Sequence, residues 1–216
     1  MIVTELSKGT KLYLLVGGRG TRLASVTNGR PKPLVDIQHQ SFLDYVLDNL
    51  SGFDITLVCS DLNYDHFKIY EKYGVEVFNE GSPSGTGGFL PKVDLPESFY
   101  VMNGDTFFSG ELNLDCDEST IFVAEEEVTH DVGYIRGESG RVKFFVEKNP
   151  NAHGKELVSL GIYKLYRDDI EIPDKLPISM EYDILPEMEL SYKILNTKRF
   201  DIGTPERLQT FKDWVC

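Results

Sequence analysis

The stretch LYLLVGGRGTRL (residues 12–23) decides the fold. Its first five residues form a short apolar run that ends at glycines, which predicts a buried strand. The turn that follows carries Arg19 and Arg22 among three glycines. Ligands of open parallel sheets bind beyond the carboxyl ends of the strands, and glycines let backbone N–H groups approach phosphate oxygens. The stretch therefore predicts a polyanion site at the end of the first strand.

Two familiar phosphate-binding loops do not fit this turn. A Walker A loop requires Gly-Lys-Ser/Thr after its glycines, and that triplet is absent. A dinucleotide fingerprint requires a third glycine where this chain has Leu23, which disfavours a nicotinamide cofactor. A tight turn without function remains the structural alternative.

Charge along the chain supports the polyanion site. The net charge is −13, which disfavours a nucleic-acid-binding protein. Residues 6–35 nevertheless contain no acidic residue and six basic ones: Lys8, Lys11, Arg19, Arg22, Arg30 and Lys32. We interpret them as a cationic island for a small polyanion, although chance clustering on a solvated face is the alternative. Prolines on both sides of Lys32 restrict the backbone there.

Strand-like and helix-like segments alternate through the first half. Strands are expected over residues 12–16, 55–59, 75–78, 99–102, 121–125, 133–135, 142–146, 161–165 and 193–200. Ser41 and Asp44 indicate a capping box before one helix, residues 61–73 form a second that ends at Gly74, and Thr204-Pro205 begins a closing helix. The GESG segment (137–140) predicts a hairpin. This order predicts an α/β fold: three layers with a Rossmann-like, doubly wound, mixed but mostly parallel sheet.

Composition is that of a globular protein. The 216 residues are 41% hydrophobic and 26% charged, enough for one domain over residues 1–216. No apolar run approaches the roughly 20 residues that span a bilayer, and the N-terminus does not have the pattern of a secretory signal. Three scattered cysteines indicate neither a disulfide framework nor a zinc site. We therefore expect a cytoplasmic protein without a membrane partner.

Further motifs, in order along the chain, carry a family resemblance. After GGRGTRL come PKPL (31–34), SGTGG (84–88), NGDTFF (103–108), VEK (146–148) and DIGTP (201–205). Together they resemble the sugar-1-phosphate nucleotidyltransferases over residues 12–211. Within that family, the chain is most similar to the short D-glycero-D-manno-heptose 1-phosphate guanylyltransferases, with Gly161-Ile162-Tyr163 and the Ser-x-Glu of residues 179–181 as added likeness.

The resemblance implies the nucleotide-diphosphosugar transferase type of fold, and a role for each motif. Arg22 and Lys32 would be catalytic, on the leaving pyrophosphate and the α-phosphate. Asp105 and Asp201 would bind Mg²⁺. The substrate-binding residues would be Glu147, Lys148 and Gly161, with the glutamate on sugar hydroxyls and the lysine on the sugar phosphate. Nucleotide binding would fall to Gly17, Gly18, Arg19, Gly20, Thr21, Gly85, Thr86, Gly87, Gly88, Asn103 and Gly104.

The implied reaction joins a nucleoside triphosphate to a sugar 1-phosphate and releases pyrophosphate, for polysaccharide biosynthesis. GTP with a heptose or mannose-type 1-phosphate is expected, and UTP, CTP or dTTP with another sugar is the alternative. Asp115-Cys116-Asp117 matches the metal motif of glycosyltransferases of related fold, and a non-catalytic nucleotide-sugar-binding protein is a further alternative. A homo-oligomer is compatible with the sequence, which does not indicate the oligomeric state.

The chain departs from the family pattern at three places. Ser159-Leu160 stand where the family often has asparagine, which leaves the sugar open. Pro91 and Pro96 would cut short the helix that follows GTGG in the family. Residues 1–11 form an extra N-terminal segment, and we expect no C-terminal acyltransferase or β-helix module.

Overall fold

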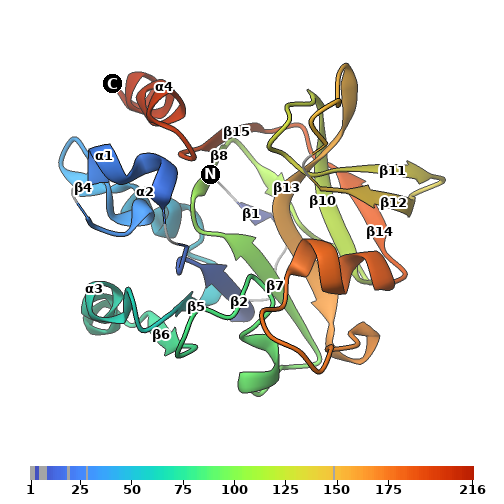
Figure 1. Ribbon diagram of the computed structural model, residues 1–216, viewed down its shortest axis with the longest axis horizontal. Helices are drawn as coiled ribbons and strands as arrows, with labels where there is room; N and C mark the ends of the chain where they lie inside the picture. Colours follow the sequence, from blue (N-terminus) through green and yellow to red (C-terminus); the bar gives the residue numbers. More distant parts are fainter. Residues whose placement is uncertain (1–2, 5–8, 19, 28, 148) are drawn as a thin grey trace. The chain divides into compact units, whose positions relative to one another are not determined.

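The computed structural model describes residues 3–4, 9–18, 20–27, 29–147 and 149–216 (Figure 1). The chain forms two compact units that interleave in sequence. Unit 1 comprises residues 1–83, 102–112 and 197–216, and unit 2 comprises residues 84–101 and 113–196. The single domain over residues 1–216 stays a prediction. No helix in the described ranges is long and apolar enough to cross a membrane.

Parallel strands form the centre of unit 1. β2 (Thr10–Leu15) pairs in parallel with β5 (Phe53–Cys59), which pairs in parallel with β6 (Glu76–Asn79). Leu12, Leu14 and Leu57 are almost fully buried, as expected for strands that helices cover on both faces. The predicted parallel order is confirmed here, and it places the glycine-rich loop at the carboxyl end of β2.

Two helices of unit 1 begin where the sequence predicts. Ser41 and Asp44 form the expected capping box at α2 (Phe42–Asn49). At α4 (Pro205–Val215), the Thr204 hydroxyl accepts a hydrogen bond from the Arg207 N–H. Such caps satisfy backbone donors that the first helical turn leaves unpaired.

An aromatic cluster joins these helices to an antiparallel strand pair of unit 1. β8 (Thr106–Ser109) pairs with β15 (Lys198–Asp201). The ring of Phe211 from α4 packs edge-on against Phe42 of α2 at 5.0 Å between centroids, and it contacts Phe107 of β8 at 5.2 Å. This packing fixes the start of α4 beside the end of β15.

Three sequence predictions need correction. The helix expected over residues 61–73 is a short α3 (Tyr64–Phe67) followed by a 3₁₀ segment (Lys68–Tyr73), although it ends at Gly74 as predicted. The strand expected over 193–200 is two strands, β14 (Ser191–Ile194) in unit 2 and β15 in unit 1. The cationic island expected over residues 6–35 is divided as well, because Lys11 pairs with Asp54 and Glu76 near the start of β2.

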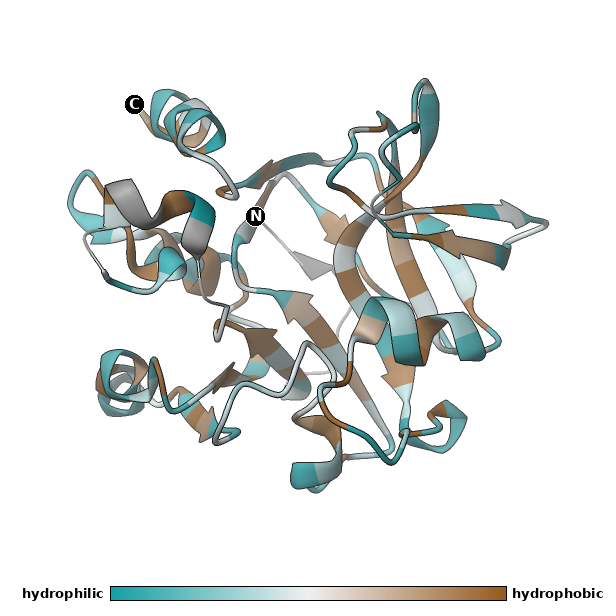
Figure 2. Ribbon diagram, in the orientation of Figure 1, coloured by the Kyte–Doolittle hydropathy of each residue, from teal (hydrophilic) through white to brown (hydrophobic). Residues whose placement is uncertain are grey.

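Unit 2 is mainly antiparallel. The long β13 (Lys155–Tyr166) pairs with β10 (Thr120–Glu127) and with β11 (Tyr134–Glu138). β14 runs parallel to β10. In Figure 2, β10 and β13 are largely hydrophobic, whereas the hairpin of β11 and β12 (Arg141–Val146) mixes hydrophobic and hydrophilic residues. That hairpin is confirmed at GESG, where Ser139 and Gly140 have φ of 50° and 79° as a two-residue turn requires.

The remaining elements are short. β7 (Ser98–Asn103) runs from unit 2 into unit 1. Pro91 lies in a three-residue 3₁₀ turn (Leu90–Lys92), so the helix after GTGG is cut short as predicted. The others are β1 (Val3–Thr4), α1 (Ala24–Thr27), β3 (Asp36–Ile37), β4 (Gln40–Ser41), β9 (Leu112–Asn113), the 3₁₀ turns at Thr21–Leu23, Lys32–Leu34, Arg167–Asp169 and Leu185–Glu187, and a π-helical turn at Met180–Ile184.

Candidate active site

The glycine-rich loop requires its glycines for two different reasons. A Cβ on Gly17 would lie 3.2 Å from Cys59 Cα, so the loop passes close to the end of β5. Gly20 has φ of +57°, and a Cβ there would lie 3.3 Å from Lys32 Cβ. Gly18 is exposed, with open space where a side chain would project. The loop therefore packs against the end of β5 at Gly17 and against Lys32 at Gly20. It leaves the backbone accessible at Gly18.

Lys32 is held rigidly, as its flanking prolines predict. It begins a 3₁₀ turn whose N-cap is Pro31, and its carbonyl accepts a hydrogen bond from the Val35 N–H. Its ammonium donates to the Asp105 carboxylate in a short ion pair. Only 15% of the Lys32 side chain is exposed, so this charge is held partly out of water next to the glycine loop.

Asp105 reaches this position because the chain passes very close to β2. The Gly104 N–H donates to the Leu15 carbonyl at 2.9 Å, and a Cβ on Gly104 would lie 2.7 Å from Val16 Cγ1. Burial raises the pKa of Asp105, but the charge and hydrogen bond of Lys32 and the Thr106 hydroxyl outweigh it and hold that pKa below its usual value. Asp105 is therefore an ionised carboxylate at neutral pH.

Asp201 lies on the strand beside Asp105. In the β8–β15 pair, Asp201 is opposite Thr106, and the Ile202 N–H donates to the Asp105 carbonyl at 3.0 Å. Asp201 Oδ1 accepts hydrogen bonds from the Gly203 N–H and from Arg207 Nη1, at 3.0 and 2.9 Å. Two carboxylates far apart in sequence are thus brought side by side, Asp201 at the end of β15 and Asp105 in the turn before β8.

Two arginines complete this cluster. A Cβ on Gly203 would lie 3.5 Å from Arg22 Nη2 and 3.5 Å from Arg207 Nη1, so both guanidinium groups lie beside the Asp201–Gly203 turn. Sequence reasoning predicted Arg22 but missed Arg207. The only sequence signal for Arg207 is that it is a basic residue in the first turn of the closing helix, where acidic residues are more usual.

The carboxylates fit the magnesium ion that the resemblance implies. Mg²⁺ prefers hard oxygen ligands, and proteins often bind it through one or two carboxylates plus substrate phosphates. Asp105 and Asp201 supply such oxygens. Among the described residues, no group of three or more histidine, cysteine or acidic side chains is arranged to hold a metal ion, so the remaining ligands would come from substrate and water.

Unit 2 carries the second set of predicted residues, and its loop 84–88 is tightly seated. The Ile178 N–H donates to the Ser84 carbonyl at 2.8 Å, and the Gly87 N–H donates back to the Ile178 carbonyl at 2.9 Å. Gly85 has φ of +89°, and a Cβ there would collide with the Ile178 carbonyl. The loop is therefore paired to residue 178 like a short strand, and glycine is required for that approach.

A carboxylate that sequence reasoning did not assign supports this loop. Glu181 Oε2 accepts hydrogen bonds from the Thr86 hydroxyl at 2.8 Å and from the Ser179 hydroxyl at 2.9 Å. The Thr86 hydroxyl oxygen also accepts from the Met180 N–H at 2.8 Å. The only sequence signal was the Ser-x-Glu likeness at residues 179–181.

The predicted sugar-binding residues lie elsewhere in unit 2. Glu147 follows β12, and its carboxylate lies over Gly133, where a Cβ would collide with it. Gly161 has φ of +67° and lies at a bulge in β13, where its N–H contacts the Ser159 hydroxyl at 3.2 Å. Burial, and then the negative charges of Glu181 and Glu147, raise the pKa of Tyr163 well above its usual value, so this tyrosine stays neutral.

Three predicted cations lie outside the part of the chain that the structure describes. Arg19 and Lys148 are not among the described residues, and neither is Lys8. Thr21 begins the 3₁₀ turn after the glycine loop, and Asn103 ends β7.

The single cationic island predicted for residues 6–35 is wrong. Lys11 lies near the opposite end of β2 and pairs with Asp54 and Glu76 at 3.1 and 2.8 Å. Arg30 pairs with Asp36 at 2.9 Å. Of the described cations in that stretch, Arg22 and Lys32 are the two at the loop.

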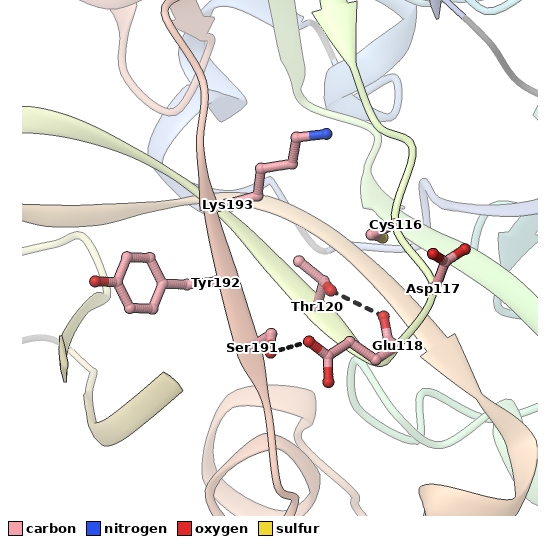
Figure 3. Close-up of a pocket in the computed structure, with 7 residues that line it drawn as sticks. All are labelled: Cys116, Asp117, Glu118, Thr120, Ser191, Tyr192 and Lys193. Carbon is pink, nitrogen blue, oxygen red and sulfur yellow. Dashed lines mark hydrogen bonds between the residues drawn. The ribbon is translucent and has the colours of Figure 1, made fainter. Parts of the chain in front are cut away.

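Cys116 and Asp117 of the Asp-x-Asp motif line a hollow of unit 2. This pocket has a volume of about 420 Å³. Figure 3 shows its lining residues, which are Cys116, Asp117, Glu118, Thr120, Ser191, Tyr192 and Lys193. Glu118 accepts from the Ser191 hydroxyl at 2.6 Å and pairs with Arg141 at 2.8 Å, while Lys193 Nζ binds the Asp115 carbonyl at 2.7 Å. These contacts are those of a solvated structural loop.

Comparisons with known proteins agree with these motifs. Residues 12–108 match the MobA-like NTP transferase domain. The Drosophila melanogaster mannose-1-phosphate guanylyltransferase catalytic subunit beta is 31% identical over 231 residues, which cover 95% of this chain and 62% of that protein. The D-glycero-alpha-D-manno-heptose 1-phosphate guanylyltransferase of Campylobacter jejuni is 30% identical over 213 residues, which cover 89% of this chain and 94% of that protein.

Solved structures give the class of fold. The crystal structure of HddC from Yersinia pseudotuberculosis matches with a TM-score of 0.80 and 27% identity, covering 96% of this chain and all of that one. The same protein complexed with GMP-PN matches with a TM-score of 0.78. The fold is thus that of the nucleotide-diphosphosugar transferases, as predicted. With the relatives above, this likeness shows that the chain belongs to the sugar-1-phosphate nucleotidyltransferase family. It spans about 62% of the length of the mannose-1-phosphate relatives it matches.

Proposed function

We propose that the chain transfers a nucleotidyl group from GTP to a heptose or mannose-type 1-phosphate and releases pyrophosphate. One observation carries the proposal. Arg22, Lys32, Asp105 and Asp201 come from three distant stretches of the chain, and unit 1 gathers them at the end of β2 and at the β8–β15 pair. The family membership and the guanylyltransferase names of two relatives support the choice of reaction.

The unit 1 residues would act on the triphosphate. An oxygen of the sugar phosphate attacks the α-phosphorus, the bond to the β-phosphate oxygen breaks, and pyrophosphate leaves in line with the attack. Such transfer depends on positioning and charge neutralisation. Backbone N–H groups of Gly18 and its neighbours would bind the phosphates, Lys32 would stabilise charge at the α-phosphate, and Arg22 would stabilise the departing pyrophosphate.

Asp105 and Asp201 would hold Mg²⁺, which when bound neutralises phosphate charge. Lys32 and Arg207 pair with these same carboxylates. Both aspartates are thereby oriented, and Lys32 keeps Asp105 ionised. Asp105→Ala is expected to lower the rate by at least about tenfold, as the loss of one charge partner in a transition state does.

The unit 2 residues would recognise the base and the sugar. Loop 84–88 would contact the base, and Glu147 would accept hydrogen bonds from sugar hydroxyls with Lys148 on the sugar phosphate. Guanine rests on the relatives, since loop contacts through backbone do not by themselves distinguish bases. The three free cysteines favour a reducing, cytoplasmic setting.

A substrate matrix tests the proposal. Purified protein with Mg²⁺ is incubated with GTP, ATP, UTP, CTP or dTTP and with a panel of sugar 1-phosphates, and pyrophosphate release is followed. GTP with a heptose or mannose-type 1-phosphate is expected to give the highest rate. A higher rate with a pyrimidine nucleotide would show that the base is a pyrimidine and not guanine. Release of nucleoside diphosphate from an intact nucleotide sugar would favour a glycosyltransferase.

A further inference from the structure

Loop 84–88 needs support from outside itself. Three of its five residues are glycines, which lose more conformational freedom on ordering than any other residue. Its backbone meets residue 178 through two hydrogen bonds, and a third contact binds Lys92 Nζ to the Ser84 hydroxyl at 3.1 Å. These contacts fix the loop at Ser84 and at Gly87 but leave the Thr86 side chain to be held separately.

Glu181 supplies that support. Its Oε2 accepts from both the Thr86 and Ser179 hydroxyls, and the Thr86 oxygen accepts in turn from the Met180 N–H. Thr86 is therefore clamped between a carboxylate and a backbone amide of one π-helical turn (Met180–Ile184). Hydrogen bonds to an ionised acceptor are stronger and shorter than neutral ones, so this carboxylate holds the loop more firmly than an amide or hydroxyl would.

The environment of Glu181 suits an anchor rather than a solvated surface acid. The side chain is half-buried, whereas its neighbour Tyr182 is exposed. Ser179 donates to Glu181 through its hydroxyl while accepting from the Tyr182 N–H at 3.3 Å. The Ser179 hydroxyl thus orients the Glu181 carboxylate independently of the loop.

We propose that Glu181 is a positioning residue for nucleotide binding, which sets loop 84–88 in its binding conformation through the Thr86 hydroxyl. The inference rests on the proposed function, because it assumes that the loop contacts the nucleotide base. A positioning residue lowers the free-energy cost of ordering the loop when nucleotide binds. Its removal should therefore weaken nucleotide binding and leave the chemical step nearly unchanged.

Binding and turnover measured separately test this role. The Kd for GTP is measured by calorimetry without sugar phosphate, and KM for GTP and kcat are measured by pyrophosphate release. Glu181→Ala and Thr86→Val are each expected to raise Kd and KM about tenfold, as loss of one charge-assisted hydrogen bond does, with kcat within about threefold. Thr86→Ser keeps the hydroxyl and should bind within about threefold of the native protein.

The double variant gives the sharpest result. Because both single changes break the hydrogen bond between Thr86 and Glu181, the loss of GTP affinity in Glu181→Ala with Thr86→Val should be smaller than the sum of the two single losses. Additive losses would overturn the proposal. Glu187→Ala, on an exposed acid in the next turn, is the matched control and should change nothing.

The outcomes separate this inference from the proposed function. If the native protein releases no pyrophosphate with any substrate pair, the proposed function fails. If it turns over but Glu181→Ala and Thr86→Val leave Kd unchanged, the anchor role alone fails. Thermal unfolding of each variant identifies loss of fold, and if Glu181→Ala does not fold, Thr86→Val against Thr86→Ser decides the case.

Discussion

The two units of this chain hold their predicted site residues in different ways. In unit 1, charged side chains pair with each other, as Lys32 does with Asp105 and Arg207 with Asp201. In unit 2, a glycine loop is held by backbone contacts and by one carboxylate outside it. In the proposed function, unit 1 would handle phosphate charge, which every substrate of the family shares, and unit 2 would handle the parts that distinguish substrates. Changes in unit 1 should therefore affect kcat, and changes in unit 2 should affect KM.

The largest effect is expected in unit 1. Lys32→Ala should lower kcat about 100- to 1,000-fold, because it removes a fixed positive charge from the α-phosphate in the transition state. Steady-state pyrophosphate release at saturating substrates measures it. Lys72→Ala, on an exposed lysine of the same unit, should stay within twofold. A decrease in kcat of less than threefold in Lys32→Ala would show that this lysine has no catalytic role.

A smaller and different effect is expected in unit 2. Glu147→Gln should raise KM for the sugar 1-phosphate about tenfold, because a charged acceptor for sugar hydroxyls becomes a neutral one, while kcat falls less. Varying the sugar phosphate at saturating GTP separates the two constants. Glu138→Gln, on an exposed acid of the β11–β12 hairpin, serves as control. A fall in kcat at constant KM would erase the distinction between the units.

Next in size is a change in the scaffold of unit 1. Thr204→Ala should lower the free energy of unfolding by about 1 kcal/mol, because it removes the N-cap of α4, whose first turn places Arg207 beside Asp201. Chemical denaturation measures it, and Thr204→Ser should restore most of the loss. Equal stability in the alanine variant would show that the Phe211 packing alone fixes the start of α4.

The smallest effect concerns the ion pairs of Lys11, near the end of β2 opposite the glycine loop. Hydrogen bonds from Lys11 and then Thr56 lower the pKa of Glu76. A lowered pKa gives stability that is present above the unfolded value of about 4.3 and lost as pH falls through the folded value. With Glu76 largely exposed, the contribution should be below about 1 kcal/mol. At pH 7 the native protein should be more stable than Glu76→Gln, and near pH 3 the free energies of unfolding of the two proteins should converge. A difference that widens at low pH would contradict the assignment.

Local signals explain why much of unit 1 could be predicted. The capping box at Ser41, the threonine cap at residue 204 and the glycine at the end of the 3₁₀ segment are short-range patterns, and the structure confirms each. The glycine loop was predictable because glycines together with arginines directly after a buried strand are typical of a phosphate-binding loop. The segment 61–73 failed in part, since whether a turn is α or 3₁₀ depends on packing that the pattern does not encode.

Long-range pairing explains what could not be predicted. The strand expected over 193–200 is divided because Ser191–Ile194 pairs with β10 while Lys198–Asp201 pairs with β8. Lys11 was grouped with Lys32 by sequence distance, yet β2 places it near the other end of the strand. Arg207 and Glu181 were missed for the same reason, since only the folded chain brings them to Asp201 and Thr86.

The fate of the triphosphate tests the central claim most directly. The protein is supplied with Mg²⁺, a mannose or heptose 1-phosphate, and GTP labelled either at the α-phosphate or at the γ-phosphate. Transfer by the unit 1 cluster predicts that the α label appears in the nucleotide sugar and the γ label in pyrophosphate, in equal amounts, and that Lys32→Ala suppresses both. No transfer of the α label to any sugar of the panel, while GTP binds tightly, would contradict the account.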